Sequence, residues 1–196
     1  MFTTQIDVGG RMVKTLEDIV PDSAPLNMMI IGKSPGINSI NSGHYFQSKQ
    51  GRLVWSMMKK YGLLKVPYGK HEDEVLIEHG YGIAYVVRRP HPFAVEATDD
   101  EFMEGIQRIE DHINRLQPSV VMFAYKSTLD RMLRLKFERY SRSYFGFNPE
   151  LDDILGYKVF VMPLPGSPVK RERVHQMMSE LRREVNPWVP HNRSIL

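Results

Sequence analysis

The chain has 196 residues, a formal net charge of +3 and no cysteine. Its length suits one domain over residues 1–196, with an irregular tail over residues 186–196. The lack of cysteine excludes disulfides, zinc–thiolate sites and cysteine-ligated iron–sulfur clusters. Apolar stretches run to about six residues, against the ~20 needed to cross a bilayer. We therefore expect a soluble intracellular protein, cytoplasmic in a prokaryote or nuclear in a eukaryote.

Apolar periodicity predicts helices and strands that alternate along the chain. An amphipathic helix over residues 14–20 precedes a strand over residues 28–32 and a helix over residues 53–61. A solvated acidic helix over residues 71–78 leads to a strand over residues 83–87. The remaining elements are a helix after Thr98 that ends before Pro118, a strand over 120–124, a helix over 127–135, a strand over 158–162 and a helix over 169–184. This order predicts a three-layer α/β/α fold with a central, mainly parallel four-stranded sheet.

The helix after Thr98 has the clearest pattern. Thr98 and Glu101 form a capping box at its start. Apolar residues then follow at 4-3-4-3 spacing, at positions 102, 106, 109, 113 and 116. That spacing places one apolar face toward the core.

A polar loop follows the strand over residues 28–32 and contains Gly32, Pro35 and Gly36. In an open α/β sheet, ligands bind at the carboxyl ends of the strands, and glycines there let backbone approach a substrate closely. A phosphate-binding GxxxxGK[ST] loop is excluded, because Asn27 occupies the place of its first glycine.

The residues of this loop match a known motif in order and spacing. They are Gly32-Lys33-Ser34-Pro35-Gly36, then Ser39, Gly43-His44-Tyr45-Phe46 and Gly51-Arg52-Leu53-Val54-Trp55. The segment resembles the first motif of the uracil-DNA glycosylase superfamily, in its mismatch-specific uracil/thymine branch: G-x-N-P-G, a serine, G-H-x-F and an N-R-x-W-like ending. Segments 81–90, 118–127 and 161–167 resemble later elements of that branch in the same order.

Three positions depart from the family pattern. Ser34 stands where the family has its catalytic asparagine, and Leu164 stands where the related branch has an asparagine in its second motif. Tyr125 replaces a glycine, whereas Lys126 matches the family's lysine. The resemblance therefore makes the substrate less certain than the fold.

The resemblance implies a monofunctional DNA glycosylase, in which water cleaves the N-glycosidic bond of a base rotated out of the duplex. Expected substrates are uracil or thymine opposite guanine, and hypoxanthine stays open. The expected partner is double-stranded DNA with a damaged or mismatched base, and the expected oligomeric state is a monomer. No membrane association, metal or cofactor is expected. The implied base-binding residues are Gly32, Pro35, Gly36, Ile37, His44 and Phe46, with Phe46 as the stacking surface.

Ser34 is the implied water-positioning residue. A serine hydroxyl can orient a water, but near neutral pH it is no useful general base. Three outcomes stay open. Stabilisation of the leaving base carries most of the rate, or Asn38, Asn41 or His44 positions the water, or hydrolysis is weak or absent.

DNA contacts are expected from two parts of the chain. The residues that the resemblance assigns to DNA are Ser39, Lys126, Leu164, Pro165, Gly166, Ser167, Lys170, Arg171 and Arg173. Leu164 suits an apolar wedge, and Ser167-Pro168 resembles a helix N-cap with proline at the first helical position. Residues 126–142 hold six Lys/Arg and two Asp/Glu, which indicates either a phosphate-facing surface or an ordinary solvated helix face.

Two further functions stay open. One is a damage-binding protein that keeps the pocket but has lost hydrolysis. The other is a nucleotide- or nucleoside-binding α/β enzyme that uses the loop from Gly32 to Gly36. The salt dependence of binding distinguishes the small-ligand enzyme from the DNA-binding alternatives. DNA binding weakens steeply with added salt because it depends on phosphate contacts, whereas binding of a neutral nucleoside hardly changes.

Overall fold

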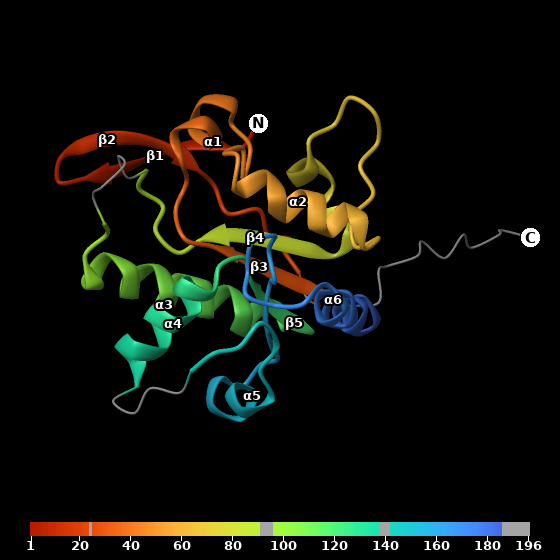
Figure 1. Cartoon of the computed structure of the whole chain (residues 1–196). Coiled ribbons are helices and arrows are strands. Elements are labelled where there is room, and N and C mark those ends of the chain that lie inside the picture. Colours follow the sequence, from red (N-terminus) through yellow and green to blue (C-terminus); the bar gives the residue numbers. More distant parts are fainter. Residues whose placement is uncertain (24, 91–95, 138–141, 186–196) are drawn as a thin grey trace, which may run out of the picture.

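The computed structural model describes residues 1–23, 25–90, 96–137 and 142–185, and its centre is a five-stranded sheet in the order β4-β3-β5-β7-β6 (Figure 1). The strands are β3 (Met28–Gly32), β4 (Tyr81–Tyr85), β5 (Val120–Phe123), β6 (Gly146–Phe147) and β7 (Val159–Val161). Strands β4, β3, β5 and β7 are parallel, and β6 pairs antiparallel with β7. The predicted parallel sheet is confirmed, and β6 adds a short edge strand that the sequence analysis missed.

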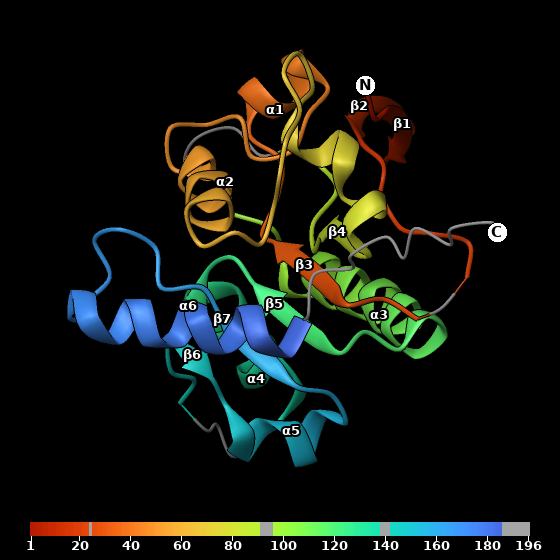
Figure 2. The ribbon, with the colours of Figure 1, turned by 90° about the vertical axis from the view of Figure 1, so that its right-hand side faces the viewer.

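Helices cover both faces of the sheet, as the predicted three-layer fold requires (Figure 2). One face carries α1 (Ile37–Ser42), α2 (Gly51–Lys60) and α6 (Arg171–Val185). The other face carries α3 (Asp99–Leu116), α4 (Lys126–Lys136) and α5 (Pro149–Leu155). Successive residues of β3 alternate between the two buried clusters, so that Met28 and Ile30 belong to the first and Met29 and Ile31 to the second.

Four of the five described α-helices after residue 50 agree well with the sequence pattern, whereas α5 was not predicted. Thr98 caps α3, and its side chain accepts a hydrogen bond from the Glu101 N–H at 3.2 Å. The apolar stripe from Phe102 to Leu116 is buried, so the predicted core face is confirmed. The ends of α2, α4 and α6 lie within two residues of the predicted ends. Among the described helices, none has the length and apolar character needed to cross a membrane.

The N-terminal helix predicted over residues 14–20 is wrong. The chain instead forms an antiparallel hairpin of β1 (Thr3–Val8) and β2 (Arg11–Leu16). Gly9 and Gly10 make the turn with φ of 61° and 82°, values that favour glycine. Leu16 and Ile19, which suggested a helix, are buried although the backbone there is extended. Ile19 forms a β-bridge to Ile83 of β4.

The acidic segment over residues 71–78 also differs from the prediction. It forms two short 3-10 turns, η1 (Glu72–Val75) and η2 (Ile77–His79), instead of a solvated helix. Asp73 is 2% exposed, so one carboxylate of this segment points into the protein. The tail expected over residues 186–196 lies outside the described residues.

Candidate active site

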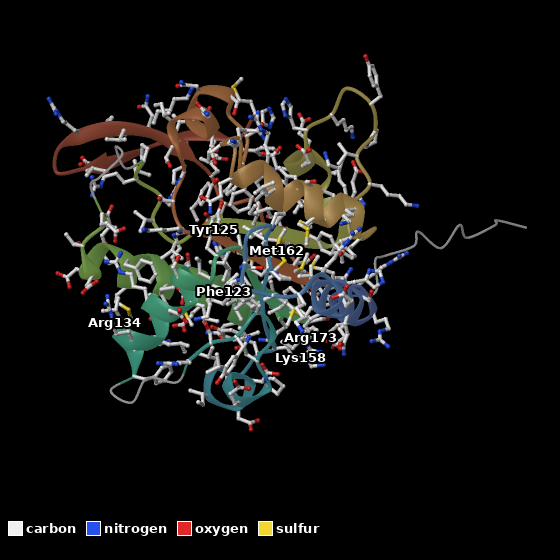
Figure 3. All side chains as sticks on the ribbon, viewed as in Figure 1. Phe123, Tyr125, Arg134, Lys158, Met162 and Arg173 are labelled. Carbon is white, nitrogen blue, oxygen red and sulfur yellow. The ribbon has the colours of Figure 1, made fainter. Side chains whose placement is uncertain are left out.

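The four segments that the sequence analysis singled out meet at one edge of the sheet. Strands β3, β4, β5 and β7 are parallel, so their carboxyl ends share that edge. Backbone hydrogen bonds continue past the strands, from Val86 N–H to the Gly32 carbonyl at 2.9 Å and from Met162 N–H to the Phe123 carbonyl at 3.0 Å. Figure 3 labels Tyr125 and Met162, which follow β5 and β7 there. This is the edge at which open α/β sheets bind ligands.

The loop after β3 presents backbone at the surface. Pro35 is buried and Ser34 is half-buried, whereas Gly36 and Ile37 are exposed. The Gly36 carbonyl accepts hydrogen bonds from the Ser39 and Ile40 N–H groups, which begins α1. The Ile37 and Asn38 N–H groups precede this bonded pair and have no intrahelical acceptor, so they remain available to a ligand.

Phe46 lies beside Gly32, where β3 ends, and the residue is only 3% exposed. The ring makes edge contacts with Trp55, Tyr85 and Tyr125, at centroid distances of 5.4, 5.6 and 6.2 Å. A Cβ on Gly32 would lie 2.6 Å from Tyr85 Cδ1 and 3.0 Å from Phe46 Cε1. Glycine at position 32 therefore lets the rings of Phe46 and Tyr85 close on the end of β3.

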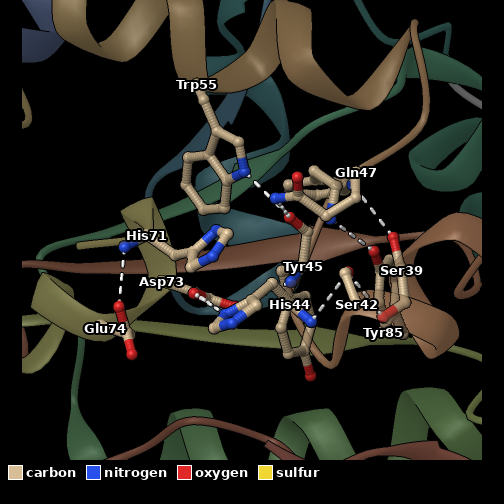
Figure 4. Close-up of polar contacts among 11 residues, drawn as sticks. Ser39, Ser42, His44, Tyr45, Gln47, Trp55, His71, Asp73, Glu74 and Tyr85 are labelled. Carbon is tan, nitrogen blue, oxygen red and sulfur yellow. Dashed lines mark hydrogen bonds and ion pairs between the residues drawn. The ribbon is translucent and has the colours of Figure 1, made fainter. Parts of the chain in front are cut away.

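His44 and Ser39 have partners inside the protein (Figure 4). His44 Nδ1 lies 2.8 Å from Asp73 Oδ1, and its ring stacks on His71 with a centroid distance of 3.6 Å. Ser39 is 2% exposed, and its hydroxyl accepts a hydrogen bond from the Gln47 N–H at 3.0 Å. The expected DNA contact of Ser39 is therefore corrected, because this buried hydroxyl orders the loop from within.

Asp73 is the residue of this region that the sequence analysis missed. Its second oxygen accepts a hydrogen bond from the Tyr45 N–H at 2.7 Å. Burial raises the pKa of the Asp73 carboxyl above its usual value, while the hydrogen bonds from Tyr45 and His44 oppose that rise. Asp73 lies outside the matched motif in an acidic run, so the residue pattern carries no signal that distinguishes it from its solvated neighbours.

The second motif forms a tight turn after β7. The Ser167 N–H donates to the Leu164 carbonyl at 3.0 Å, and Gly166 has φ of 92°. Proline at the second position and glycine at the third fit a type II turn. Pro165 and Gly166 are exposed at its tip, whereas Leu164 packs partly against the core. The exposed tip is therefore Pro165-Gly166, not the Leu164 side chain that was expected to form a wedge.

The predicted cap of the last helix is also wrong. Helix α6 begins at Arg171, so Ser167-Pro168 belongs to the loop before the helix. Lys170, Arg171 and Arg173 are exposed at the start of α6, and within the described residues they have no ion-pair partner. Figure 3 labels Arg173 on this helix. An open hollow of about 260 Å³ separates the turn from α2 and is lined by Tyr61, Leu164 and Arg171, among others.

The comparisons with known proteins agree with this geometry. The model of the uracil DNA glycosylase superfamily matches residues 21–189. The chain is 29% identical over 127 residues to the G/U mismatch-specific uracil DNA glycosylase of Schizosaccharomyces pombe, a match that covers 62% of this chain and 39% of that protein. This chain thus matches well under half the length of that relative. Because the family match extends over most of the chain, the protein belongs to the uracil DNA glycosylase superfamily.

Proposed function

We propose that this protein is a DNA glycosylase that excises a deaminated or mismatched base. The observation that carries the proposal is the meeting of the family's motif segments at one sheet edge, in a chain that belongs to that superfamily. Uracil or thymine opposite guanine is the proposed substrate, and the name of the Schizosaccharomyces pombe relative supports the G:U mismatch. Hypoxanthine is the second candidate, because Ser34 and Leu164 depart from the family pattern.

The proposed reaction begins when the target nucleotide rotates out of the duplex. The base stacks on Phe46, which is 3% exposed, so the aromatic side chains around it must move apart to admit the base. Backbone N–H groups at Gly36 and Ile37 stabilise the negative charge that develops on the leaving base. The sugar gains oxocarbenium character as the N-glycosidic bond breaks, and water then adds to the sugar carbon.

Ser34 is proposed to orient that water. Within the described residues its hydroxyl has no hydrogen-bond partner, so one donor and two acceptor sites are available. No general base is assigned, because a dissociative reaction depends mainly on stabilising the leaving group. The reaction leaves an abasic site and an uncleaved strand, as expected for a monofunctional enzyme acting as a monomer.

The test is single-turnover excision on end-labelled oligonucleotides that carry G:U, G:T, A:U, single-stranded uracil or hypoxanthine. Alkali reveals the abasic sites, and the untreated lane distinguishes hydrolysis from strand cleavage by the enzyme. Alkali-dependent cleavage of any substrate supports the proposal and identifies the lesion. Salt-sensitive lesion binding without excision would instead support a damage-binding protein, and the absence of both activities would favour a small-ligand enzyme.

A further inference from the structure

The backbone of Phe46 is strained. Its φ is 57°, in the left-handed region that a bulky residue rarely adopts. Gly51 packs so closely on it that a Cβ at residue 51 would lie 2.8 Å from Phe46 backbone atoms. Strained residues persist only where their surroundings hold them, and they concentrate at functional sites.

Three consecutive backbone N–H groups hold this segment through side chains from three different elements (Figure 4). Tyr45 N–H donates to Asp73 Oδ2 at 2.7 Å, Phe46 N–H donates to the Tyr85 hydroxyl at 3.1 Å, and Gln47 N–H donates to the Ser39 hydroxyl at 3.0 Å. The indole N–H of Trp55 donates to the Tyr45 carbonyl at 2.9 Å. The conformation at Phe46 thus depends on a network, and Asp73 supplies its acidic member.

Burial of the Asp73 carboxylate is unfavourable unless the carboxylate accepts hydrogen bonds. The residue is 2% exposed, and both of its oxygens are bonded to the segment, one to Tyr45 N–H and the other to His44. A buried carboxylate requires such hydrogen bonds to offset its lost hydration. By contrast, its neighbour Glu74 is exposed and accepts a hydrogen bond from His71 N–H within its own turn.

We propose that Asp73 is a positioning residue of the active site, which holds residues 44–47 so that the Phe46 ring stays beside Gly32 at the end of β3. The inference rests on the proposed function, because it assigns the held ring to base stacking. Asp73 acts through Tyr45 and His44 and does not itself touch the substrate. Its replacement moves the Phe46 ring and lowers excision more than it lowers binding to undamaged DNA.

The first experiment needs no activity. The Trp55 indole N–H signal in a ¹⁵N–¹H spectrum, assigned with Trp55→Phe, reports on the Tyr45 carbonyl that it bonds. Asp73→Asn keeps the side-chain volume and should shift this signal. The matched control Glu74→Gln alters the same 3-10 turn and should leave it in place. An unmoved signal in folded Asp73→Asn would overturn the inference. Should Asp73→Asn fail to fold, Asp73→Glu keeps the charge, displaces the carboxylate by one methylene and takes the same test.

The second experiment is a double-mutant cycle with Phe46→Leu, measured as the maximal single-turnover rate. Asp73→Asn should lower the rate about tenfold in the wild-type background, as small misplacements of reacting groups do. It should lower the rate little in the Phe46→Leu background, because residues that act through one another are not additive. Affinity for undamaged duplex should stay within about twofold, since phosphate contacts dominate that affinity.

The outcomes separate the two proposals. Equal losses in both backgrounds would mean that Asp73 does not act through Phe46 and would overturn the inference. A wild-type protein that excises no base from any lesion duplex would contradict the proposed function, and the Trp55 signal would still decide whether Asp73 holds the segment.

Discussion

Two basic segments follow neighbouring parallel strands of the sheet, and they use their charge differently. Helix α4 follows β5, and its cations bind acids of the same chain: Lys126 binds Asp130, Arg131 binds Asp99, and Lys136 binds Glu110. Arg131 also lies over the Phe102 ring, with its guanidinium carbon 4.5 Å from the centroid. Arg131 and Lys136 therefore join α4 to α3, and Arg131 also bonds the Ala97 carbonyl before α3, whereas Lys126 pairs within α4.

The start of α6 follows β7 and carries the contrasting set. Lys170, Arg171 and Arg173 are exposed, and the described part of the chain places no acid within ion-pair distance of them. In the sequence, the basic run over residues 126–142 fitted a phosphate-facing surface and a solvated helix face equally well, whereas Lys170, Arg171 and Arg173 were expected to contact DNA. Because a cation that already pairs with an acid is less available to phosphate, we expect the start of α6, more than α4, to contact DNA.

The largest expected effect is on DNA binding by the start of α6. Replacing Lys170, Arg171 and Arg173 together with alanine should lower duplex affinity about 10²-fold at 0.1 M salt and reduce the log–log salt slope by about 2–3. Fluorescence anisotropy over a salt series measures both quantities. The matched control is Arg134→Ala, an arginine of α4 that is 65% exposed and should change affinity less than about twofold. If Arg134→Ala lowered duplex affinity as much as the triple replacement in α6, the expected difference between α4 and α6 would be wrong.

The second prediction separates the chemical step from DNA binding, and it concerns Ser34 in the loop after β3. Ser34→Ala should lower the maximal single-turnover rate about tenfold or more, because the attacking water loses its orientation. Lesion affinity and its salt slope should stay at wild-type values, unlike those of the α6 variant. An undiminished rate in a folded Ser34→Ala protein would refute the water-positioning role.

The third prediction concerns stability and the paired helix. Arg131→Gln should lower the free energy of unfolding by about 1.5–3 kcal/mol, because hydrogen bonds to a charged partner are lost. Those bonds join Arg131 to Asp99 and to the Ala97 carbonyl, each within 2.7 Å. Duplex affinity should not change. Denaturant unfolding and anisotropy of the same preparation check both statements, and a loss of affinity without a loss of stability would assign Arg131 to DNA instead.

The smallest effect is expected at the tip of the second motif. Gly166→Ala should lower the free energy of unfolding by about 1 kcal/mol, because alanine resists a left-handed φ. The φ of Gly166 is 92°, and no atom lies within 4 Å of the place where a Cβ would be. Gly36→Ala is the control, since Gly36 has φ of −83° and equal space. If both substitutions cost the same in chemical denaturation, strain at the turn is not the cause.

The sequence predicted the parallel sheet and its main helices because their residues repeat with strong apolar periods. The motif order also predicted which segments meet, since the carboxyl ends of parallel strands share an edge. The N-terminal hairpin was missed although Gly9-Gly10 between alternating residues is a hairpin signal. The apolar residues after the hairpin suggested helical spacing, and their burial against β4 decided the outcome instead.

The site was less predictable than the fold. Asp73 contacts the motif loop across 28 residues of sequence, and only the folded chain brings it to Tyr45 N–H. The same is true of Arg131, whose partner Asp99 lies 32 residues away in the sequence. By contrast, Lys126 and Asp130 are four residues apart on one helix, a spacing that the sequence alone shows. Leu164 was expected to be a wedge from its place in the motif, but the type II turn exposes Pro165-Gly166 and leaves Leu164 against the core.

The most direct test of the account is to identify the free base released from a G:U duplex by mass spectrometry, with an A:U duplex beside it. The account predicts free uracil from the G:U duplex and a strand that stays intact until alkali is added. The absence of any released base at saturating protein, from G:U, G:T and hypoxanthine duplexes alike, would contradict it.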